Sequence, residues 1–177
     1  MATLIVALVA VAVILAGMAG LAHSSIGPQA TLSDSFREMR ERTGQAARTG
    51  MSSLGVTVQA GGSTVDWSVM NDGQARLHSF ESWDLFMVYQ DAPGGGLQIQ
   101  RLAYTDATSP AAGEWTVEGI YRDVSTLTGE VYEPGIVNPG EELIVRAVVS
   151  PAVATPTDNS ILLAVTSGVT VTAQFSN

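Results

Sequence analysis

The first 22 residues of the chain, MATLIVALVAVAVILAGMAGLA, contain no charged side chain. Twelve of these 22 residues are methionine, leucine, isoleucine or valine, and Thr3 carries the only hydroxyl group among them. As a helix with a rise of about 1.5 Å per residue, the segment would span about 33 Å, close to the thickness of the hydrocarbon core of a bilayer. The segment therefore favours lipid or the interior of a protein assembly over exposure to water.

Three interpretations of residues 1–22 are open. A cleavable secretory signal needs a basic region ahead of its apolar core, and none precedes Leu4. A membrane anchor is the simplest alternative. The third is a helix that lies in the membrane first and later packs among identical helices, and small residues spaced by four favour it because they let backbones approach closely. The residues predicted to pack in that core are Thr3, Leu4, Ile5, Ala7, Leu8, Ala12, Ile14, Leu15, Ala16 and Gly20.

Helical signals are interrupted after the apolar segment and then resume. Gly27 and Pro28 predict a kink or a short break, because proline lacks the N–H group that a helix interior needs. A second helix is predicted from about Leu32 to Arg48, with Gly50 as a natural stop. A single apolar stripe on this helix implies a partner surface, on the following domain or on neighbouring subunits. The stripe consists of Leu32, Phe36, Met39 and Thr43.

From Ser52 onward the hydrophobic pattern changes to period two, which is typical of strands. Glycine, proline and asparagine clusters separate the segments, as turns require. The predicted strands cover residues 54–60, 63–70, 83–90, 97–105, 114–122, 142–150, 161–167 and 169–176. Seven to nine short strands without helices between them indicate a β-sandwich with Greek-key connections, and Trp67, Trp83 and Trp115 are predicted to fill its core.

The predicted fold class is therefore α+β. A long N-terminal hydrophobic helix, kinked near Pro28, precedes an all-β immunoglobulin-like sandwich. We expect two domains, residues 1–50 as the apolar helix with its amphipathic stem and residues 51–177 as the outer sandwich.

Charge is distributed unevenly along the chain. Residues 23–48 carry four arginines against three acidic residues, whereas residues 49–177 carry four arginines against fourteen. The acidic distal part would repel a phosphate backbone, so nucleic acid is not an expected partner. The chain has no cysteine, which excludes disulfides, cysteine-ligated zinc and thiol nucleophiles.

The sequence offers little catalytic chemistry. His78 is predicted to lie in a strand beside Ser79, with Glu81 and Asp84 near in sequence, but neither a nucleophile elbow nor an oxyanion signature accompanies them. No phosphate-binding loop or dinucleotide fingerprint is present, so we expect neither an enzyme nor an organic cofactor. A structural calcium ion is conceivable on loop aspartates, although solvated carboxylates are the simpler interpretation. Those residues are Asp72, Asp84, Asp91, Asp106 and Asp123.

Three segments resemble one family. MATLIVALVAVAVILAG at residues 1–17 looks like a processed archaellin N-terminus, and residues 69–90 and 134–149, VMNDGQARLHSFESWDLFMVYQ and PGIVNPGEELIVRAVV, look like archaellin β-domains. Archaellins are the filament subunits of the archaeal swimming organelle and are related to type IV pilins. Bacterial pilins usually carry glutamate at the fifth mature position, where this chain has Ile5.

The resemblance implies a homopolymeric, extracellular, cell-surface filament used for motility. It implies a precursor that is transiently inserted in the membrane and cut by a prepilin-type peptidase, with Met1 as the processed end, and an assembly ATPase on a membrane platform. Two alternatives share this layout, an adhesive archaeal-type pilin and a membrane-anchored accessory or stator protein of the same motor.

Overall fold

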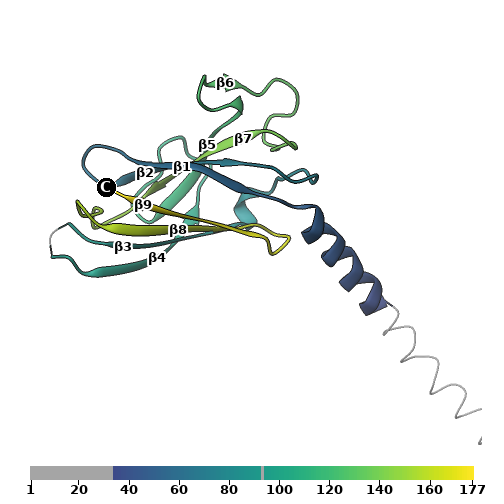
Figure 1. Cartoon of the computed structure of the whole chain (residues 1–177), viewed down its shortest axis with the longest axis horizontal. Coiled ribbons are helices and arrows are strands. Elements are labelled where there is room, and N and C mark those ends of the chain that lie inside the picture. The colour runs from purple at the N-terminus through teal and green to yellow at the C-terminus, as the bar shows by residue number, and fades with distance from the viewer. Residues whose placement is uncertain (1–33, 93) are drawn as a thin grey trace, which may run out of the picture. The chain divides into compact units, whose positions relative to one another are not determined.

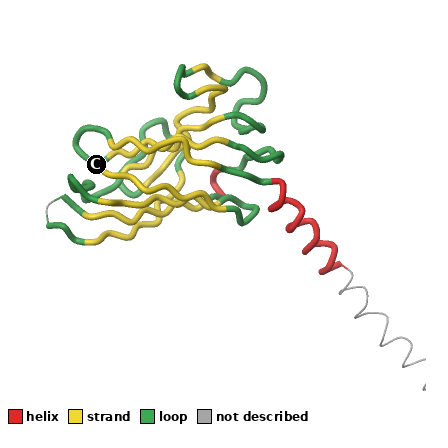
Figure 2. Tube along the Cα trace, in the orientation of Figure 1, coloured by secondary structure: helices red, strands yellow, loops and turns green. Residues whose placement is uncertain are grey.

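The computed structural model describes residues 34–92 and 94–177 (Figure 1). The segment predicted to form the long hydrophobic helix and the predicted kink at Gly27 and Pro28 lie outside these residues. Residues 34–48 are helical and are followed directly by the strands of the β domain (Figure 2). The helix ends at Arg48, as predicted, and Gly50 follows two residues later. Residues 45–177 form one compact unit, apart from residues 1–44, and the predicted domain division after residue 50 stays a prediction.

All eight predicted strands are present, with bounds that differ from the prediction by a few residues. They are β1 (Ser52–Val58), β2 (Thr64–Met70), β3 (Asp84–Gln90), β4 (Leu97–Tyr104), β5 (Glu114–Asp123), β7 (Glu142–Val148), β8 (Asp158–Ala164) and β9 (Thr170–Ser176). Two further short elements are not predicted by the sequence. They are the 3-10 helix η1 (Phe80–Ser82) and the strand β6 (Thr128–Gly129), which pairs with β5.

The strands form two layers of four, β1-β2-β7-β5 and β4-β3-β8-β9 (Figure 1). Every neighbouring pair within a layer is antiparallel. A short parallel pairing, of Ala103 with Glu114 and of Tyr104 with Trp115, joins the two layers at one edge. This is the strand order of an immunoglobulin sandwich that has one additional strand in its second sheet.

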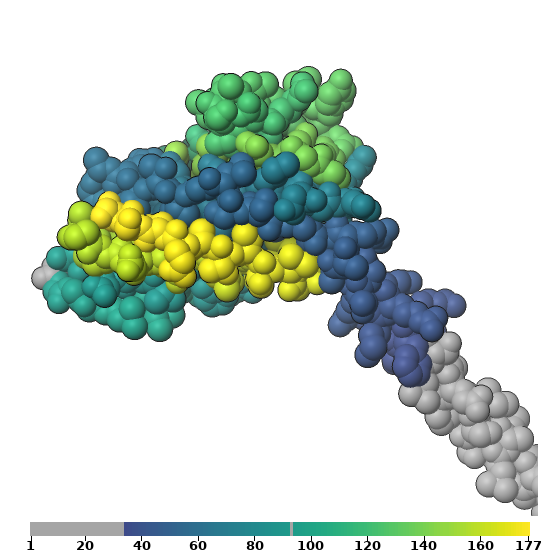
Figure 3. Space-filling model, in the orientation of Figure 1, coloured from purple at the N-terminus to yellow at the C-terminus, as the bar shows by residue number. Residues whose placement is uncertain are grey.

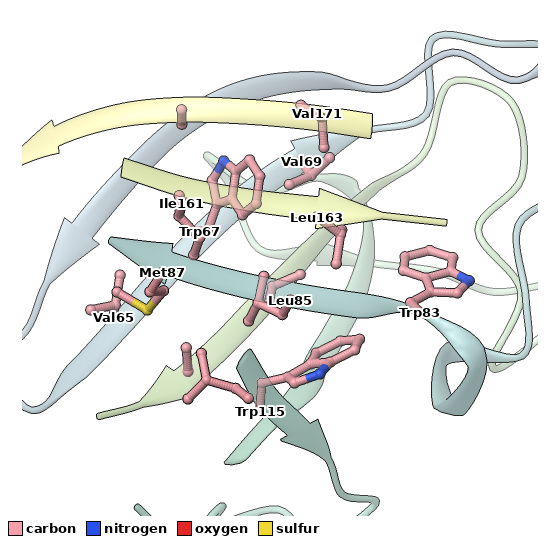
Figure 4. Packing of buried hydrophobic residues seen from close by; sticks show 14 of the residues in the cluster. Val65, Trp67, Val69, Trp83, Leu85, Met87, Trp115, Ile161, Leu163 and Val171 are labelled. Carbon is pink, nitrogen blue, oxygen red and sulfur yellow. The ribbon is translucent and has the colours of Figure 1, made fainter. Parts of the chain in front are cut away.

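The core lies between the layers and follows from the alternation along each strand. On β2, Val65, Trp67 and Val69 point inward and are fully buried, while the residues between them are partly exposed. The same alternation on β3, β7, β8 and β9 brings the two inner faces together (Figure 4). Each large apolar side chain buried here contributes about 1.5–3 kcal/mol. Burial of Trp67, Trp83 and Trp115 confirms that all three tryptophans belong to the core.

The segment that crosses from β2 to β3 corrects one prediction. His78 lies in a loop before η1 and not in a strand, and its side chain is exposed. Trp83 Nε1 donates a hydrogen bond to the His78 carbonyl at 3.1 Å, and the Phe80 and Trp83 rings meet edge to face with centroids 4.9 Å apart. Phe80 and Trp83, at the two ends of η1, thus cover the end of the core. His78 lies in the loop that positions these two side chains.

Residues 124–136 are the first part of the connection from β5 to β7, contain β6, and project from the sandwich as an arm (Figure 3). Its exposed apolar side chains are those of Leu127, Val131 and Tyr132. Arg76 and Glu133 form an ion pair at 3.1 Å that ties the arm to the segment after β2. Both partners are exposed, so this ion pair adds little stability.

Candidate assembly site

The residues predicted to pack in a core of identical helices lie outside the described part of the chain, and so their packing stays a prediction. Among residues 34–92 and 94–177, no helix is both long enough and apolar enough to span a bilayer. The described features that bear on assembly are the stem helix, its junction with the β domain, and one outer face of the sandwich.

The stem helix, residues 34–48, presents apolar side chains to solvent. Phe36 and Met39 are 61% and 63% exposed and lie three residues apart, so they share one face. Arg42 and Glu38 form an i,i+4 ion pair at 2.5 Å, which orders the polar side of the helix but adds little stability because both side chains are exposed. One face of the stem helix therefore carries two large exposed apolar side chains.

The end of the helix is fastened to the β domain through the backbone. The Arg48 carbonyl accepts hydrogen bonds from the Gln74 N–H at 2.7 Å and the Ala75 N–H at 3.1 Å. Carbonyls in the last turn of a helix have no partner inside the helix, so these two donors cap one of them. The Thr49 N–H closes the turn onto the Gln45 carbonyl at 3.0 Å.

Two glycines make this close approach possible. A Cβ on Gly73 would lie 2.3 Å from the Gly50 nitrogen and 2.6 Å from the Arg48 carbonyl oxygen. A Cβ on Gly50 would lie 2.5 Å from a carboxylate oxygen of Asp72 and 3.0 Å from the Gly73 nitrogen. Any side chain at position 73 would therefore push two backbone segments apart.

Asn71 is the centre of the junction and is fully buried. Its Nδ2 donates to the carbonyls of Ala75 at 2.8 Å and Val137 at 2.9 Å, and its Oδ1 accepts from the Gly73 N–H at 3.2 Å. Its backbone N–H donates to the Glu141 carbonyl at 2.9 Å, and its carbonyl accepts from Gly140 at 2.8 Å. Asn71 thereby joins residues 69–90 to residues 134–149, the two β-domain segments that resemble archaellins. In the sequence Asn71 belongs to one of the clusters that separate the predicted strands, and nothing else distinguishes it.

The outward face of the β4-β3-β8 part of the sandwich is apolar, which sequence reasoning also missed. Ile99 lies opposite Val88 in the β3–β4 ladder and is 70% exposed, and Phe86 lies opposite Leu162 in the β3–β8 ladder. Leu97 extends the patch along β4 and is 66% exposed. We call these five residues the outer apolar face.

The sequence did carry a signal for this face. Strands β3 and β8 read as almost continuous apolar runs, LFMV and ILLA, where a half-exposed strand would alternate. Continuous runs are typical of strands covered on both faces. An exposed apolar patch is typical of an interaction surface.

The five aspartates proposed for calcium do not converge. Asp84 accepts a hydrogen bond from Arg101 Nε at 2.8 Å, and Asp123 accepts the Ser125 N–H at 2.9 Å. The hydrogen bonds from Ser125 lower the pKa of the Asp123 carboxyl. Across residues 34–92 and 94–177, no three histidine, aspartate or glutamate side chains gather as metal ligands would.

Asp91 organises the loop between β3 and β4. Its Oδ1 accepts the N–H groups of Gly94 at 3.0 Å and Gly96 at 3.1 Å, and its Oδ2 accepts Gln98 Nε2 at 2.9 Å. The Gln98 hydrogen bond, followed by that of Gly96, lowers the pKa of Asp91. The connection between β3 and β4 is thus a glycine-rich hairpin loop with this carboxylate as its anchor.

We expect Asp91→Ala to loosen this loop at neutral pH, because three donors lose their acceptor. In the unaltered chain the carboxylate contribution is complete above the ordinary aspartate pKa of about 3.9 and disappears as the pH falls through the lower folded value. Amide hydrogen exchange of Gly94 and Gly96 would measure both effects. Exposed Asp106 provides the control, and protection that is equal in Asp91→Ala and Asp106→Ala would contradict the assignment.

His78 and Ser79 do come into contact, with Nδ1 and Oγ 2.7 Å apart. They are sequence neighbours on an exposed loop, and within the described ranges no carboxylate bonds to the histidine. A nucleophile–base pair needs a third group that orients the base. The contact therefore lacks the arrangement that hydrolysis requires.

No protein-family model and no curated protein sequence matches the chain. Solved structures do match. The archaeal flagellum of Methanospirillum hungatei strain JF1 has a TM-score of 0.58 at 12% identity, over 97% of this chain and 90% of that one. The archaeal flagellin FlaB1 of Methanocaldococcus jannaschii has a TM-score of 0.51 at 18% identity, over 73% and 90%.

A third match is the archaellum periplasmic stator protein FlaG of Sulfolobus acidocaldarius. Its TM-score is 0.50 at 18% identity, over 72% of this chain and 99% of that one. At these identities the likeness concerns the fold alone. The sandwich, its strand order and these three matches together give this chain the archaellin-type fold, which a flagellin, a flagellar filament and a stator protein share.

Proposed function

We propose that the chain is the structural subunit of a helical extracellular filament, the archaellum, which serves swimming motility and assembles through its N-terminal hydrophobic helix. The observation that carries this proposal is the match to the assembled archaeal flagellum over 97% of the chain, whereas the match to the stator protein covers 72%. A filament subunit needs an apolar segment for the interior as well as an outer domain, and residues 1–22 supply the first.

The exposed surfaces of the described part support a polymer. Phe36 and Met39 on the stem, and Ile99 and Leu97 on the outer apolar face, lie on separate elements. A helical filament uses heterologous contacts, in which two different surfaces of each copy meet on its neighbours. The acidic distal residues would keep finished filaments soluble and apart from one another.

Assembly follows from the chemistry of residues 1–22. The precursor waits in the membrane, is cut by a prepilin-type peptidase, and its helix then moves from lipid into a bundle of identical helices. Because lipid is already apolar, close packing at small residues such as Ala16 and Gly20 must favour the bundle, together with an assembly ATPase on a membrane platform. The reverse step into water would expose twelve large apolar side chains, at a cost of about 20–35 kcal/mol.

The runner-up function is an anchored stator or accessory module. The match to the stator protein favours it, because that match covers 99% of the stator chain. A monomeric module would use the outer apolar face against a surface layer or a partner and would leave residues 1–22 in the bilayer. An adhesive pilin uses the same assembly as the first proposal and differs in lacking rotation.

Electron microscopy and mass spectrometry of sheared cell-surface material separate these functions. A filament subunit is expected to be the dominant protein of the sheared filaments. If the filaments contain another protein and this chain stays in the membrane fraction, the stator proposal replaces the first. Swimming assays on cells lacking the chain then distinguish motility from adhesion.

A further inference from the structure

A pocket of about 530 Å³ lies between the arm and the sandwich. We call it the arm pocket. Its walls include the apolar side chains of Phe80, Tyr104, Val117 and Ile120, which come from η1, the end of β4 and the middle of β5. Gly129 of β6 forms part of the opposite wall, and a Cβ at this position would meet no other atom within 4 Å. The glycine therefore leaves space that a side chain from outside can occupy.

Two carboxylates line the same pocket. Glu130 Oε1 accepts the Glu133 N–H at 2.7 Å, which fixes this carboxylate on the arm. Glu81 is exposed, and it forms no hydrogen bond or ion pair with any residue in the described ranges. Burial, and after it the charges of Asp106 and Glu81, raise the pKa of the Tyr104 phenol. The pocket thus combines apolar walls with negative charge.

The stem helix carries apolar and positively charged side chains, which complement the apolar walls and carboxylates of the arm pocket. Met39 and Arg40 lie three and four residues after Phe36, so each is a neighbour of Phe36 on the helix surface, one on either side of it. Met39 is a flexible apolar side chain that fits irregular cavities. Arg40 forms no ion pair within residues 34–92 and 94–177. The helix from 34 to 48 carries four arginines against three acids, whereas residues 49–177 are strongly acidic.

We infer that the arm pocket of one copy receives the stem helix of a second copy, with Met39 against the apolar walls and Arg40 beside Glu81 and Glu130. The inference rests on the proposed function, since it specifies one contact of the homopolymer. Helix and pocket are different surfaces, so the contact is heterologous and can repeat from copy to copy without closing. The opposite charges also set the orientation of the helix on the pocket.

Cysteine cross-linking tests the contact directly, because the chain has no native cysteine. We would express the full chain as Met39→Cys/Gly129→Cys and oxidise sheared filaments. A ladder of covalent dimers, trimers and higher species on a denaturing gel is expected. Filaments that give no ladder, or only an internally bridged monomer, would overturn the inference and leave the filament function intact. Met39→Cys/Thr172→Cys, with the second cysteine on exposed β9, should give no ladder.

A charge exchange tests the same contact without requiring Met39 to change. Glu81→Arg and Arg40→Glu are each expected to reduce filament yield at least about tenfold, since like charges at an interface cost several kcal/mol. Co-expression of the two variants should restore filaments, because each copy then meets an oppositely charged neighbour. Asp158→Arg alters net charge equally at a distant exposed site and should have no effect.

The outcomes separate this inference from the proposed function. Normal filaments from both single variants, or no recovery on co-expression, would refute the contact. A wild-type chain that never enters filaments would refute the proposed function and the contact with it. Recovery in a single Glu81→Arg/Arg40→Glu chain but not in the mixture would mean that helix and pocket meet within one chain.

Discussion

Replacing Ala16 with aspartate is expected to abolish filaments at the cell surface while the β domain still folds. A charged side chain at the centre of an apolar helix costs about 2.5–3.5 kcal/mol on insertion into a membrane, and in a close-packed bundle it would also separate the helices. Gly20→Leu should have the same effect through bulk alone, since a large side chain prevents the approach of two backbones.

The measurement is electron microscopy and immunoblotting of the sheared surface fraction, with near-ultraviolet circular dichroism of the purified full chain as a test of folding. Thr172→Asp adds the same charge at an exposed position of β9 and should leave filament yield unchanged. Wild-type numbers of filaments from either helix variant would refute packing of residues 1–22 as the basis of assembly.

Asn71→Leu is expected to lower the free energy of unfolding by about 3 kcal/mol. The substitution removes two N–H donors, so the carbonyls of Val137 and Ala75 lose partners, and each buried unsatisfied group costs about 1–3 kcal/mol. Asn71→Asp should be at least as damaging, because a carboxylate oxygen would then face two carbonyl oxygens. For a domain of this size the melting temperature should fall by about 10 °C.

Thermal and denaturant unfolding of the full chain would measure this effect. Gln100→Leu is the matched control. Gln100 also donates a hydrogen bond from its side-chain amide, but to one carbonyl, that of Ser150, and this hydrogen bond is exposed. Its substitution should cost less than about 0.5 kcal/mol. If both variants unfold alike, Asn71 is not the centre of the junction.

Both the filament proposal and the stator proposal require an intact junction between the stem helix and the β domain. In either proposed role the helix end must stay attached to the sandwich, and the Arg48 carbonyl with its two backbone donors makes that attachment. Variants at Gly73 should therefore impair a filament subunit and a stator alike. Variants at Gly73 test how the helix end is anchored, whereas variants in the arm pocket and in residues 1–22 test assembly.

The sequence predicted the elements of the sandwich because their signals are local. Period-two alternation identified β2 and β7, and the tryptophans were assigned to the core from their size and setting. The helix end near Gly50 followed from glycine chemistry. The strand β6 has only two residues, too few to produce a periodic signal.

What the sequence could not provide depends on contacts between distant segments. The Asn71 side chain reaches a carbonyl 66 residues away, and no local pattern distinguishes it from an ordinary turn asparagine. The same holds for the arm pocket, whose walls come from η1, β4, β5 and β6. For the five aspartates the sequence suggested a shared role in calcium binding that their positions do not support. Acidic residues look alike in sequence, whereas in the structure Asp84 pairs with an arginine and Asp91 anchors a turn.

The β domain cannot complete its core until strand β9 has been synthesised. This strand supplies Val171, Ala173 and Phe175 to the core and pairs along its whole length with β8. β8 and β9 are consecutive strands, but the side chains that β9 buries pack in a core shared with the rest of the sandwich, so this core is incomplete until β9 has been synthesised. If residues 1–22 enter the membrane as proposed, they can do so before the sandwich is complete, because they are synthesised first, and the β domain then folds on a tethered chain. Nascent chains that stop short of β9 would be held at the membrane without a completed core, where proteases can remove them.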